Sequence, residues 1–453
     1  MEINTAIVAG TGKSGISATK LLVNHGVKVY LFDENKDRDI EAIKEKTGDS
    51  ELVQIELGEL GEDALSSSQL MVISPGIPVD APFTDVVRNA GIPIWSEIEL
   101  AYHYGKGKIA AITGTNGKTT TTALVGEIVK AHNAKTIVVG NIGIPYTELC
   151  DTTDDDSDTV AEISSFQLET VIDFHPNVSA ILNLTPDHLN RHYTFENYGN
   201  VKFSITKNQT MDDVTVLNYD DEHTRAMGEK AKDHCHVVYF SRLEKPERAL
   251  SGVRISWLML DGDKKINVLA IKDLKLMGAH NVENVLAAVG ISYYMGVPVD
   301  VIRDVATSFK AVAHRIEYVD TVDGVAYYND SKGTNPDAAI KGIQAMVAPT
   351  FLIGGGYDKG SEYDEWIEAF DGKVKWLVLI GQTAQKIADC AKRHGFNSII
   401  FEENLQDAVA YCHENAVDGD AVLLSPACAS WGQFDNYEQR GDMFKEYVRS
   451  YKE

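Results

Sequence analysis

Short runs of apolar residues, each long enough for one strand, recur along the chain and are separated by stretches with helical spacing. The first runs are 6–9 and 27–32, with a helical segment through Leu21 and Leu22 between them. Similar runs follow at 70–73, 136–139, 160–163, 178–182, 214–217, 237–240, 327–329, 351–353, 377–380, 399–401 and 422–424. The segments 383–393 and 405–415 carry apolar residues three and four positions apart, as amphipathic helices do. Apolar strands that alternate with helices predict an α/β fold built on parallel sheets.

Two of these strands run into glycine-rich loops. After the first strand comes Gly10-Thr11-Gly12-Lys13-Ser14-Gly15, and Asp33 follows the second strand about twenty positions later. This is a Rossmann-like opening, in which the glycines admit a diphosphate and the acid meets a ribose hydroxyl. A further strand ends at the tight turn Ser74-Pro75-Gly76, where open α/β sheets place ligands. The pattern predicts a nucleotide diphosphate without saying which one.

The stretch 108–120 is the most informative in the chain. It reads as a buried strand, the turn Gly114-Thr115-Asn116-Gly117 and a helix that begins with Lys118-Thr119-Thr120. Glycines let backbone N–H groups turn toward an anion, the lysine reaches the outer phosphates, and the Thr119 hydroxyl can hold Mg²⁺. The sequence therefore predicts a phosphate-binding loop.

A chain of 453 residues exceeds what one hydrophobic core usually organises. We predict three domains. Residues 1–106 form a Rossmann-like domain, 107–311 a central α/β domain of the P-loop ATPase type, and 312–453 a second Rossmann-like, doubly wound domain with a parallel sheet. A helix at 96–104 is expected to link the first two.

Composition narrows the choice of function. The formal charge is −25, which disfavours nucleic acid and anionic membranes as partners. No apolar run approaches the length of a membrane span, and the N-terminus lacks the features of a signal peptide. Five scattered cysteines without metal-ligand spacing suit a reducing compartment. We expect a cytoplasmic protein.

Several further motifs occur in a fixed order. They are Asn141-Ile142-Gly143, Glu162-Ile163-Ser164-Ser165-Phe166-Gln167, Asp187-His188, His314-Arg315, Asn329-Asp330-Ser331-Lys332-Gly333-Thr334-Asn335, Gly354-Gly355-Gly356-Tyr357-Asp358-Lys359 and Ser425-Pro426-Ala427-Cys428-Ala429-Ser430-Trp431. With the two glycine-rich loops, this set resembles the Mur ligases over essentially the whole chain. Within that family it is most similar to the members that add D-glutamate.

The resemblance implies an ATP-dependent ligase that adds D-glutamate to UDP-N-acetylmuramoyl-L-alanine in peptidoglycan precursor synthesis. In that reaction the ATP γ-phosphate is transferred to the terminal carboxylate, and the amine of D-glutamate attacks the acyl phosphate. Phosphate is a good leaving group, and Mg²⁺ neutralises the charge that develops. We expect a monomer that acts on small molecules and has no nucleic-acid or membrane partner.

The resemblance also implies roles for individual residues. The catalytic residues would be Lys118, Glu162, His188 and Lys202. ATP would be bound by Gly114, Thr115, Asn116, Gly117, Lys118, Thr119, Thr120, Asn281, Asn284, Arg315 and Asp330. Mg²⁺ would be held by Thr119, Glu162, His188 and Lys202, the last as a carbamate formed with CO₂. The UDP-substrate would be bound by Ser14, Asp33, Ser74, Pro75, Gly76 and Asn141, and D-glutamate by Lys332, Thr334, Lys359, Ser430 and Tyr437.

Three alternatives remain open at this point. An NAD-dependent oxidoreductase would explain the first glycine-rich loop and Asp33, but not Gly117-Lys118-Thr119. A nucleotide-gated interaction protein would need no chemistry of its own. Within the family, a ligase that adds L-alanine, a diamino acid or glutamate to folate is the nearest competitor.

Overall fold

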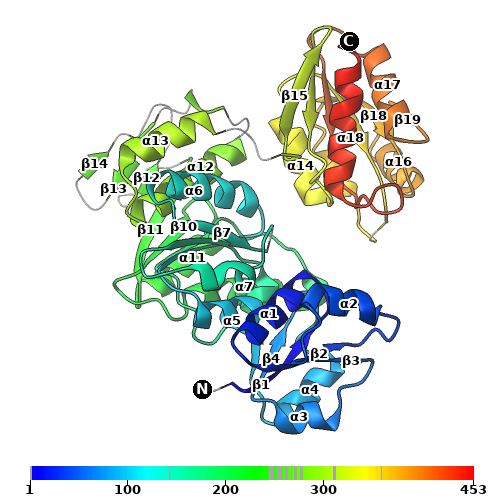
Figure 1. The fold of residues 1–453 in the computed structure, drawn as a ribbon. Helices are drawn as coiled ribbons and strands as arrows, with labels where there is room; N and C mark the ends of the chain where they lie inside the picture. Colours follow the sequence, from blue (N-terminus) through cyan, green and yellow to red (C-terminus); the bar gives the residue numbers. More distant parts are fainter. Residues whose placement is uncertain are drawn as a thin grey trace. The chain divides into compact units, whose positions relative to one another are not determined.

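The structure, a computed structural model, contains three main β-sheets in chain order (Figure 1). It describes residues 3–141, 143–243, 249–251, 258–260, 264–266, 268–269, 273–275, 279–309, 313–358 and 360–452. Contacts divide the chain into two compact units, Met1–Leu274 with Glu283–Ser308, and Lys275–Val282 with Phe309–Glu453. The first unit contains two of the main sheets and the second contains one.

The three predicted domains match the three main sheets, while their limits remain predictions. The limit at residue 106 falls between helix α5 (Glu97–Tyr104) and strand β6 (Lys108–Thr113). The limit between 311 and 312 lies outside the described residues.

The first sheet is parallel, with strand order β3-β2-β1-β4-β5. Its strands are β1 (Thr5–Ala9), β2 (Lys28–Asp33), β3 (Val53–Leu57), β4 (Leu70–Ile73) and β5 (Ile94–Ser96), and its helices are α1 (Lys13–Asn24), α2 (Ile40–Thr47), α3 (Glu62–Ser67), α4 (Pro82–Asn89) and α5. Side chains alternate between faces along β1, so Ala6 and Val8 pack in one core cluster and Ile7 and Ala9 in another. Both faces are therefore apolar, which explains the strands without polar alternation. The strand order reverses between β1 and β4, where ligands bind in open α/β sheets.

The second sheet has seven parallel strands in the order β12-β11-β10-β9-β6-β8-β7. Besides β6, these are β7 (Ile137–Gly140), β8 (Asp158–Glu162), β9 (Val178–Ile181), β10 (Val214–Asn218), β11 (His236–Ser241) and β12 (Ala249–Ser251). Its helical segments are α6 (Lys118–His132), α7 (Tyr146–Leu149), η1 (Cys150–Thr152), α8 (Ser165–Leu168), α9 (Leu189–His192), α10 (Phe195–Phe203), η2 (Ser204–Thr206), α11 (Glu222–Ala231), α12 (Ala279–Tyr294) and α13 (Val299–Ser308). A short antiparallel pair, β13 (Leu258–Leu260) and β14 (Lys264–Ile266), was not expected from the sequence. Since β6 pairs with both β8 and β9, the loops after these three strands meet at one edge.

The third sheet has six strands in the order β15-β16-β20-β17-β18-β19. They are β15 (Glu317–Val322), β16 (Val325–Asn329), β17 (Thr350–Gly354), β18 (Val374–Leu379), β19 (Ile399–Phe401) and β20 (Ala421–Leu424). Helices α14 (Pro336–Ala345), α15 (Asp364–Glu368) and α16 (Ala384–Arg393) contribute to one core layer, and α17 (Leu405–Asn415) and α18 (Tyr437–Ser450) to the other.

The prediction of a parallel third sheet is confirmed for five strands and wrong for β15, which runs antiparallel to β16. The two strands are joined by Asp323-Gly324, both with positive φ (50° and 80°). An Asp-Gly pair between two strands is a strong hairpin signal. The sequence therefore contained the information that corrects the prediction.

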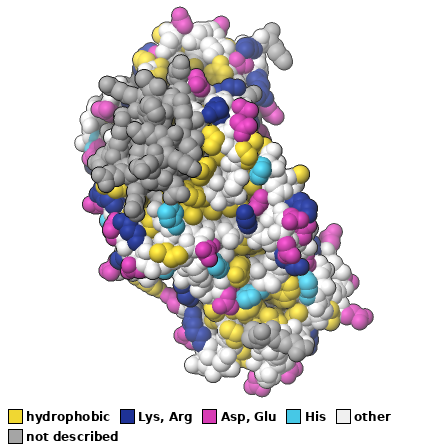
Figure 2. Space-filling model, turned by 90° about the vertical axis from the view of Figure 1, so that its left-hand side faces the viewer, with side chains coloured by type: hydrophobic (Ala, Val, Ile, Leu, Met, Phe, Trp, Pro, Cys, Tyr) yellow, Lys and Arg dark blue, Asp and Glu magenta, His cyan; other side chains and the backbone are white. Residues whose placement is uncertain are grey.

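The surface is mixed in charge. Figure 2 shows acidic and basic side chains interspersed over one face. Among the residues that the structure describes, none of the helices has the length and apolar character needed to cross a membrane.

Two glycines of the third-sheet unit, one after β17 and one after α16, provide a test of packing. At Gly355 (φ +99°) an added Cβ would lie 2.2 Å from the carbonyl oxygen of Ile380, whereas at Gly395 (φ +80°) it would meet nothing within 4 Å. Left-handed strain alone costs about 1–2 kcal/mol, so Gly395→Ala should lose that amount of unfolding free energy. Gly355→Ala should lose about 2–5 kcal/mol because overpacking is added. Denaturant unfolding of the full chain checks this, and equal losses would contradict the crowding at Gly355.

Candidate active site

The phosphate-binding loop connects β6 to α6 at the centre of the second sheet. Gly114 and Gly117 have φ values of +147° and +85°, which only glycine adopts readily. A Cβ at Gly117 would lie 2.2 Å from Oδ1 of Asn284, so α12 packs directly on the loop. Asn281 and Asn284 are both buried, and they are three positions apart on the first turns of α12. The loop therefore has the backbone geometry that the sequence predicts.

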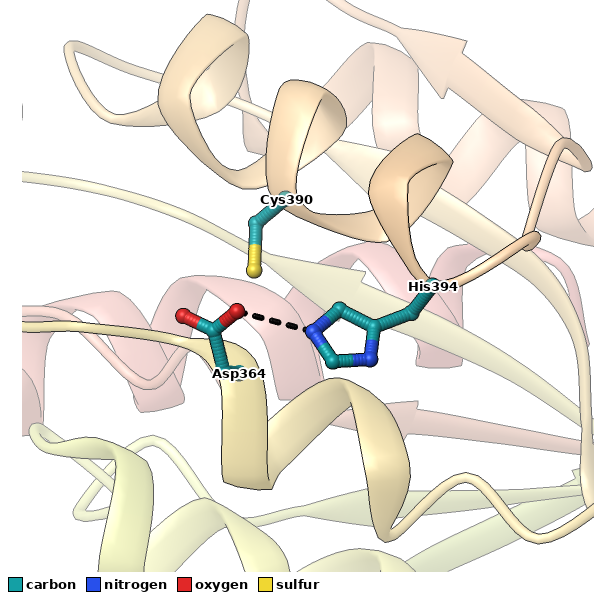
Figure 3. A group of neighbouring side chains, drawn as sticks. All are labelled: Asp364, Cys390 and His394. Carbon is teal, nitrogen blue, oxygen red and sulfur yellow. Dashed lines mark hydrogen bonds and ion pairs between the residues drawn. The ribbon is translucent and has the colours of Figure 1, made fainter.

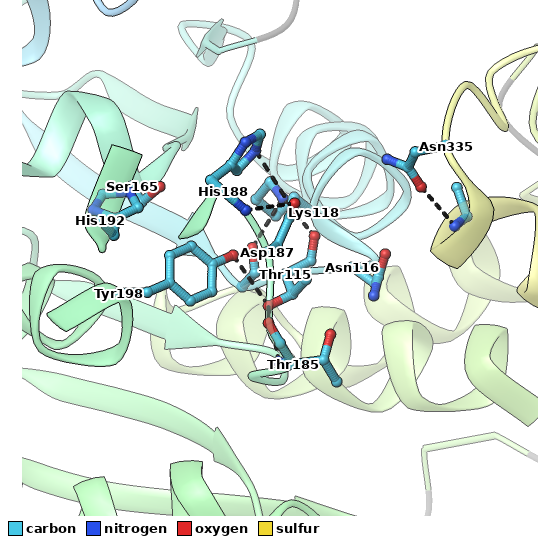
Figure 4. A network of polar contacts seen from close by, with 12 residues as sticks. Thr115, Asn116, Lys118, Ser165, Thr185, Asp187, His188, His192, Tyr198 and Asn335 are labelled. Atoms are coloured by element: carbon cyan, nitrogen blue, oxygen red, sulfur yellow. Dashed lines mark hydrogen bonds and ion pairs between the residues drawn. The ribbon is translucent and has the colours of Figure 1, made fainter. Parts of the chain in front are cut away.

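Side chains from the neighbouring strand end hold the loop in place. The Asn116 backbone N–H donates to Oδ1 of Asn183 (2.8 Å), and the Asn183 amide donates back to the Asn116 carbonyl (3.0 Å). The Thr115 hydroxyl lies 3.1 Å from the Tyr198 hydroxyl and also contacts the backbone of Thr185 (Figure 4). Sequence reasoning did not single out Asn183 as a site residue, although a polar residue just after an apolar strand was a usable signal.

Lys118 bends back over the loop. Its amine donates to the carbonyl oxygens of Gly114 (2.9 Å) and Thr115 (2.8 Å). Lys118 and Thr119 are half-buried, while Thr120 is buried in the first turn of α6. The lysine and the Thr119 hydroxyl thus lie where the helix N-terminus meets the loop, a position that favours phosphate.

Glu162 ends β8 directly beside this loop, in register with Ile112 of β6 and Gly140 of β7. Its carboxylate is buried and accepts a hydrogen bond from the Asn141 amide (3.0 Å), while its carbonyl accepts from the Asn141 backbone N–H (2.8 Å). At Gly140 a Cβ would lie 2.1 Å from the same carbonyl. The loop after β7 is therefore wrapped tightly around Glu162.

Lys202 reaches the phosphate loop from α10. It is 1% exposed, and its amine donates to the Gly114 carbonyl (3.0 Å) and to the Thr113 hydroxyl (3.4 Å). Burial and the positive charge of Lys118 hold the pKa of Lys202 well below its usual value, although the carboxylates of Asp187 and Glu162 act in the opposite direction. The environment therefore favours the neutral amine.

His188 lies close to the loop lysine in Figure 4. It adopts a left-handed conformation (φ 53°) that turns the chain into α9, its ring centroid is 4.8 Å from that of Phe166, and its Nε2 lies 3.5 Å from Asp187. The nearby His192 is buried, with its Nε2 3.0 Å from the Ser165 hydroxyl. Burial and neighbouring positive charges lower the pKa of His192 to about 4, so its ring is neutral near pH 7.

The structure thus brings four predicted catalytic residues to one edge of the second sheet. They are Lys118 on the loop, Glu162 at the end of β8, His188 at the start of α9 and Lys202 on α10.

A separate pocket opens at the strand-order reversal of the first sheet. Its volume is about 490 Å³, and all six residues expected to bind the UDP-substrate line it: Ser14, Asp33, Ser74, Pro75, Gly76 and Asn141. The Asp33 carboxylate accepts from the Thr11 hydroxyl (2.6 Å) and the Asn35 backbone and lies 3.2 Å from Arg38. Burial would raise the pKa of Asp33, but these hydrogen bonds and the Arg38 charge outweigh it and keep the acid ionised. Lys13 and Arg38, which also line the pocket, were not predicted.

The third sheet positions the remaining residues. Asp330 is completely buried at the end of β16, 3.5 Å from Arg315 and 2.7 Å from the Ser425 hydroxyl. Burial raises the pKa of Asp330 to about 6, against the opposing effects of Arg315 and Ser425. Asp330 therefore connects Arg315 and Ser425 at the strand ends, and it is also one of the residues predicted to bind ATP.

The loops expected to bind D-glutamate adjoin one another at this edge. The Lys332 amine lies 5.6 Å from the ring centre of Tyr437, Thr334 follows in the same loop, and Ser430 is buried. Lys359 lies outside the described residues.

One buried residue missed by sequence reasoning, Arg440, ties two of these loops together. It donates to the Ser331 hydroxyl (2.9 Å), the Ser331 carbonyl (2.7 Å) and the Cys428 carbonyl (3.2 Å). Burial lowers the pKa of Arg440 to about 10.

Comparison with known proteins agrees with this architecture. The family model described as the Mur ligase MurD-like N-terminal domain matches residues 4–96, the Mur ligase middle domain matches 112–292, and the Mur ligase glutamate ligase domain matches 314–428. The UDP-N-acetylmuramoylalanine–D-glutamate ligase of Lachnospira eligens is 55% identical over 99% of both chains. The protein of the same name from Clostridioides difficile is 45% identical over 98% of both.

Solved structures support the fold. UDP-N-acetylmuramate-alanine ligase MurC from Thermotoga maritima aligns with a TM-score of 0.60 at 19% identity, covering 99% of this chain and 100% of that one. MurF from Acinetobacter baumannii aligns with a TM-score of 0.60 at 16% identity, covering 97% and 93%. From the full-length relatives and the three family models together, the chain belongs to the Mur ligase family.

Proposed function

We propose that this Mur ligase joins D-glutamate to UDP-N-acetylmuramoyl-L-alanine at the expense of ATP, as a step of peptidoglycan precursor synthesis. The relatives that carry this activity in their name match over nearly the whole chain at 45–55% identity. The observation that carries the proposal is the meeting of the phosphate loop, Glu162 and Lys202 at one sheet edge. An NAD-dependent oxidoreductase or a protein without chemistry would not need that arrangement. The enzyme acts on small molecules, and we place it in the cytoplasm as a monomer without nucleic-acid or membrane partners.

The reaction begins with a carboxylate, which is a poor acyl donor. The terminal carboxylate of the UDP-substrate attacks the γ-phosphorus of ATP, the bond to ADP breaks, and an acyl phosphate forms. The amine of D-glutamate then attacks the acyl carbon, and phosphate leaves with a proton released from the nitrogen. Lys118 and the backbone N–H groups of the loop stabilise negative charge on the transferred group, as preorganised donors do.

The oxygen groups at the loop suit Mg²⁺. Thr119 offers a hydroxyl, and Glu162 a buried carboxylate that accepts from Asn141 and still has room for further partners. We assign Thr119 and Glu162 to one Mg²⁺ and His188 with modified Lys202 to a second. Bound Mg²⁺ would neutralise phosphate charge and orient the transferred group. The protein's own contribution is to hold these donors beside Lys118.

Lys202 is proposed to act as a carbamate. The neutral amine forms an N–C bond to CO₂ and loses a proton, which gives an anion. A buried cation next to Lys118 is unfavourable, as the lowered pKa of Lys202 reflects, whereas an anion there attracts both Lys118 and a metal ion. The modification thus converts a repulsive pair into an attractive one.

The three substrates are assigned to separate groups of residues. We assign the UDP portion to the pocket of Ser14, Asp33, Ser74–Gly76 and Asn141, where α1 points its N-terminus at the diphosphate. For ATP, residues 114–120 would bind the phosphates, and Asn281 and Asn284 would contact the adenine. Arg315 would also contact the phosphates, and Asp330 would contact the ribose. The carboxylates of D-glutamate would be met by the cations Lys332 and Lys359 and by hydroxyl donors from Thr334, Ser430 and Tyr437.

The direct test is phosphate release from ATP with UDP-N-acetylmuramoyl-L-alanine and a panel of D- and L-amino acids. Release that depends on both substrates, with D-glutamate preferred over every other amino acid, is the expected result. A preference for L-alanine or a diamino acid would reassign the chain within the family. No release with any amino acid would refute the proposal.

Lys118→Ala should lower kcat by about 10²–10³-fold or more, because a preorganised cation at the transferred phosphate is lost. The affinity for the UDP-substrate should stay unchanged, since the 490 Å³ pocket does not include Lys118. Steady-state kinetics and calorimetric titration of the UDP-substrate check the two parts. Lys130→Ala, at an exposed position on the last turn of α6, is the matched control and should behave as the parent. Loss of both properties in Lys118→Ala would contradict two separate sites.

Lys202→Ala should lower kcat roughly 10²-fold or more, because a metal ligand and its charge are removed. The parent enzyme should also lose activity in CO₂-depleted buffer and regain it with bicarbonate. With ¹³C-bicarbonate, NMR should show a carbamate signal that Lys202→Ala lacks. The exposed Lys207 is the control, and Lys207→Gln should keep both the signal and the activity. Full activity of the parent without CO₂ would exclude the modification.

A further inference from the structure

Three metal-ligating side chains of different chemistry meet in the third-sheet unit, and none of them is assigned to the reaction. Asp364 is the first residue of α15, Cys390 lies on α16, and His394 follows the end of α16 (Figure 3). One ligand atom from each lies within 4.8 Å of the other two, and Nε2 of His394 is 2.8 Å from the Asp364 carboxylate. The thiol and the imidazole both approach the carboxylate in Figure 3.

The elements that carry these groups are fixed by the core. Cys390 lies in the last turn of α16 and His394 is the residue that caps its C-terminus, four positions later, so both lie at the same end of the helix. Trp366 and Ile387 anchor α15 and α16 in the same apolar cluster. Cys390 is 2% exposed, while the side chains of His394 and Asp364 are 26% and 44% exposed. The cluster is thus buried on the thiol side and open to solvent on the other, which gives an ion an entry path.

A further carboxylate faces the other nitrogen of the histidine. Nδ1 of His394 lies 3.7 Å from Glu368, four positions after Asp364 on α15. Metal-bound histidines commonly direct their second nitrogen at a carboxylate, which fixes the ring orientation and tautomer. At 3.7 Å Glu368 is an electrostatic neighbour of Nδ1, and Nε2 faces Asp364.

From this arrangement we infer a site for a borderline-soft divalent cation of the Zn²⁺ class, held by Cys390, His394 and Asp364 with water completing the shell. Zn²⁺ binds thiolate, imidazole and carboxylate at about 2.0–2.3 Å, so in a tetrahedral site the ligand atoms stand roughly 3.3–3.8 Å apart. Small side-chain rotations bring the three groups to that spacing. Mg²⁺ is excluded because it does not select thiolate. Binding releases the thiol proton to solvent and links α15 to α16.

Two alternative roles for these three side chains need no metal ion. A Cys-His-Asp nucleophile needs an activated thiolate, but burial and the Asp364 charge raise the pKa of Cys390 to about 11. The second is a hydrogen-bonded cluster without an ion, in which His394, Arg393 and the Cys390 thiol all pair with Asp364, and the cobalt titration below distinguishes it from a metal site.

The second such cluster among the described residues, Glu99, His103 and Asp173, has a structural role. Its Glu99 carboxylate already accepts three backbone N–H groups, from residues 172 to 174, at 2.7–3.0 Å. It therefore joins α5 to the segment before β9.

Cobalt provides a readout that separates the Cys390 site from any Mg²⁺ site. Titrating the reduced, metal-free full chain with Co²⁺ should give near-ultraviolet thiolate-to-cobalt absorption that saturates at one equivalent and is displaced by Zn²⁺. Cys390→Ser should abolish it. His394→Gln should weaken Co²⁺ binding by more than the ~10–100-fold that outer-shell changes cost, and Glu368→Gln should fall within that range. His394→Gln leaves the buried thiol in place, so it remains informative if Cys390→Ser fails to fold.

The control is Cys235→Ser, in which a hydroxyl can replace the thiol that donates to the Ala231 carbonyl, and its cobalt absorption should match the parent. Absence of thiolate–cobalt absorption in the parent would overturn the site. So would its survival in both Cys390→Ser and His394→Gln. Ligase turnover plays no part in this measurement, so the outcome is independent of the proposed reaction.

Discussion

Two lysine amines, from Lys118 and Lys202, donate to the same carbonyl oxygen, that of Gly114. Two cations so close together in a buried place repel each other strongly, because burial limits screening by solvent. Something in the site must remove one charge or add negative charge. The lowered pKa of Lys202 removes one positive charge by favouring the neutral amine. The neighbouring carboxylates of Glu162 and Asp187 add negative charge. Bound ATP phosphates would add a third, so the arrangement favours an anion at the loop.

The parallel sheet explains how these groups come together. The carboxyl ends of neighbouring parallel strands share one edge, so β6 contributes the loop, β8 contributes Glu162, and the segment after β9 contributes Asn183 and His188. Lys202 is the exception because it comes from α10 and crosses to the loop from a helix. Its amine needs the hydrogen bonds that it makes, since an unpaired polar group buried there would be costly. The order of the parallel strands thus places most of the site residues, and helix α10 adds Lys202.

Sequence reasoning identified the parts of the site that depend on local pattern. The apolar runs predicted most strands of the three main sheets, but not β3, β5, β12 or β15, and glycine spacing predicted the phosphate loop. The six residues expected at the UDP-substrate line one pocket, but their assignment to that substrate came from the family resemblance and stays a prediction. Lys202 could only come from family resemblance, because its burial and lowered pKa arise from contacts with segments far away in the chain. Sequence reasoning missed Arg440 and Asn183 for the same reason. A polar residue that pairs with a distant part of the backbone leaves no periodic pattern in the sequence. The β15 hairpin was different, because its Asp-Gly turn is a local signal in the sequence that the prediction did not use.

An acidic protein that binds three anionic substrates has to separate local charge from net charge. The formal charge of −25 is spread over the chain, and exposed charges more than ~8 Å from a site are largely screened at physiological salt. The electrostatic potential at a bound phosphate is therefore set by the nearest charged groups. In the first pocket these are Lys13, Arg38 and the start of α1, and at the loop they are Lys118 and the start of α6. Glu162 and Asp187 lie near these cations, and a divalent cation between carboxylate and phosphate would offset the repulsion between the two anions. The same argument explains why Asp33 stays ionised inside the first pocket, since hydrogen bonds from Thr11 and the Arg38 charge stabilise its carboxylate.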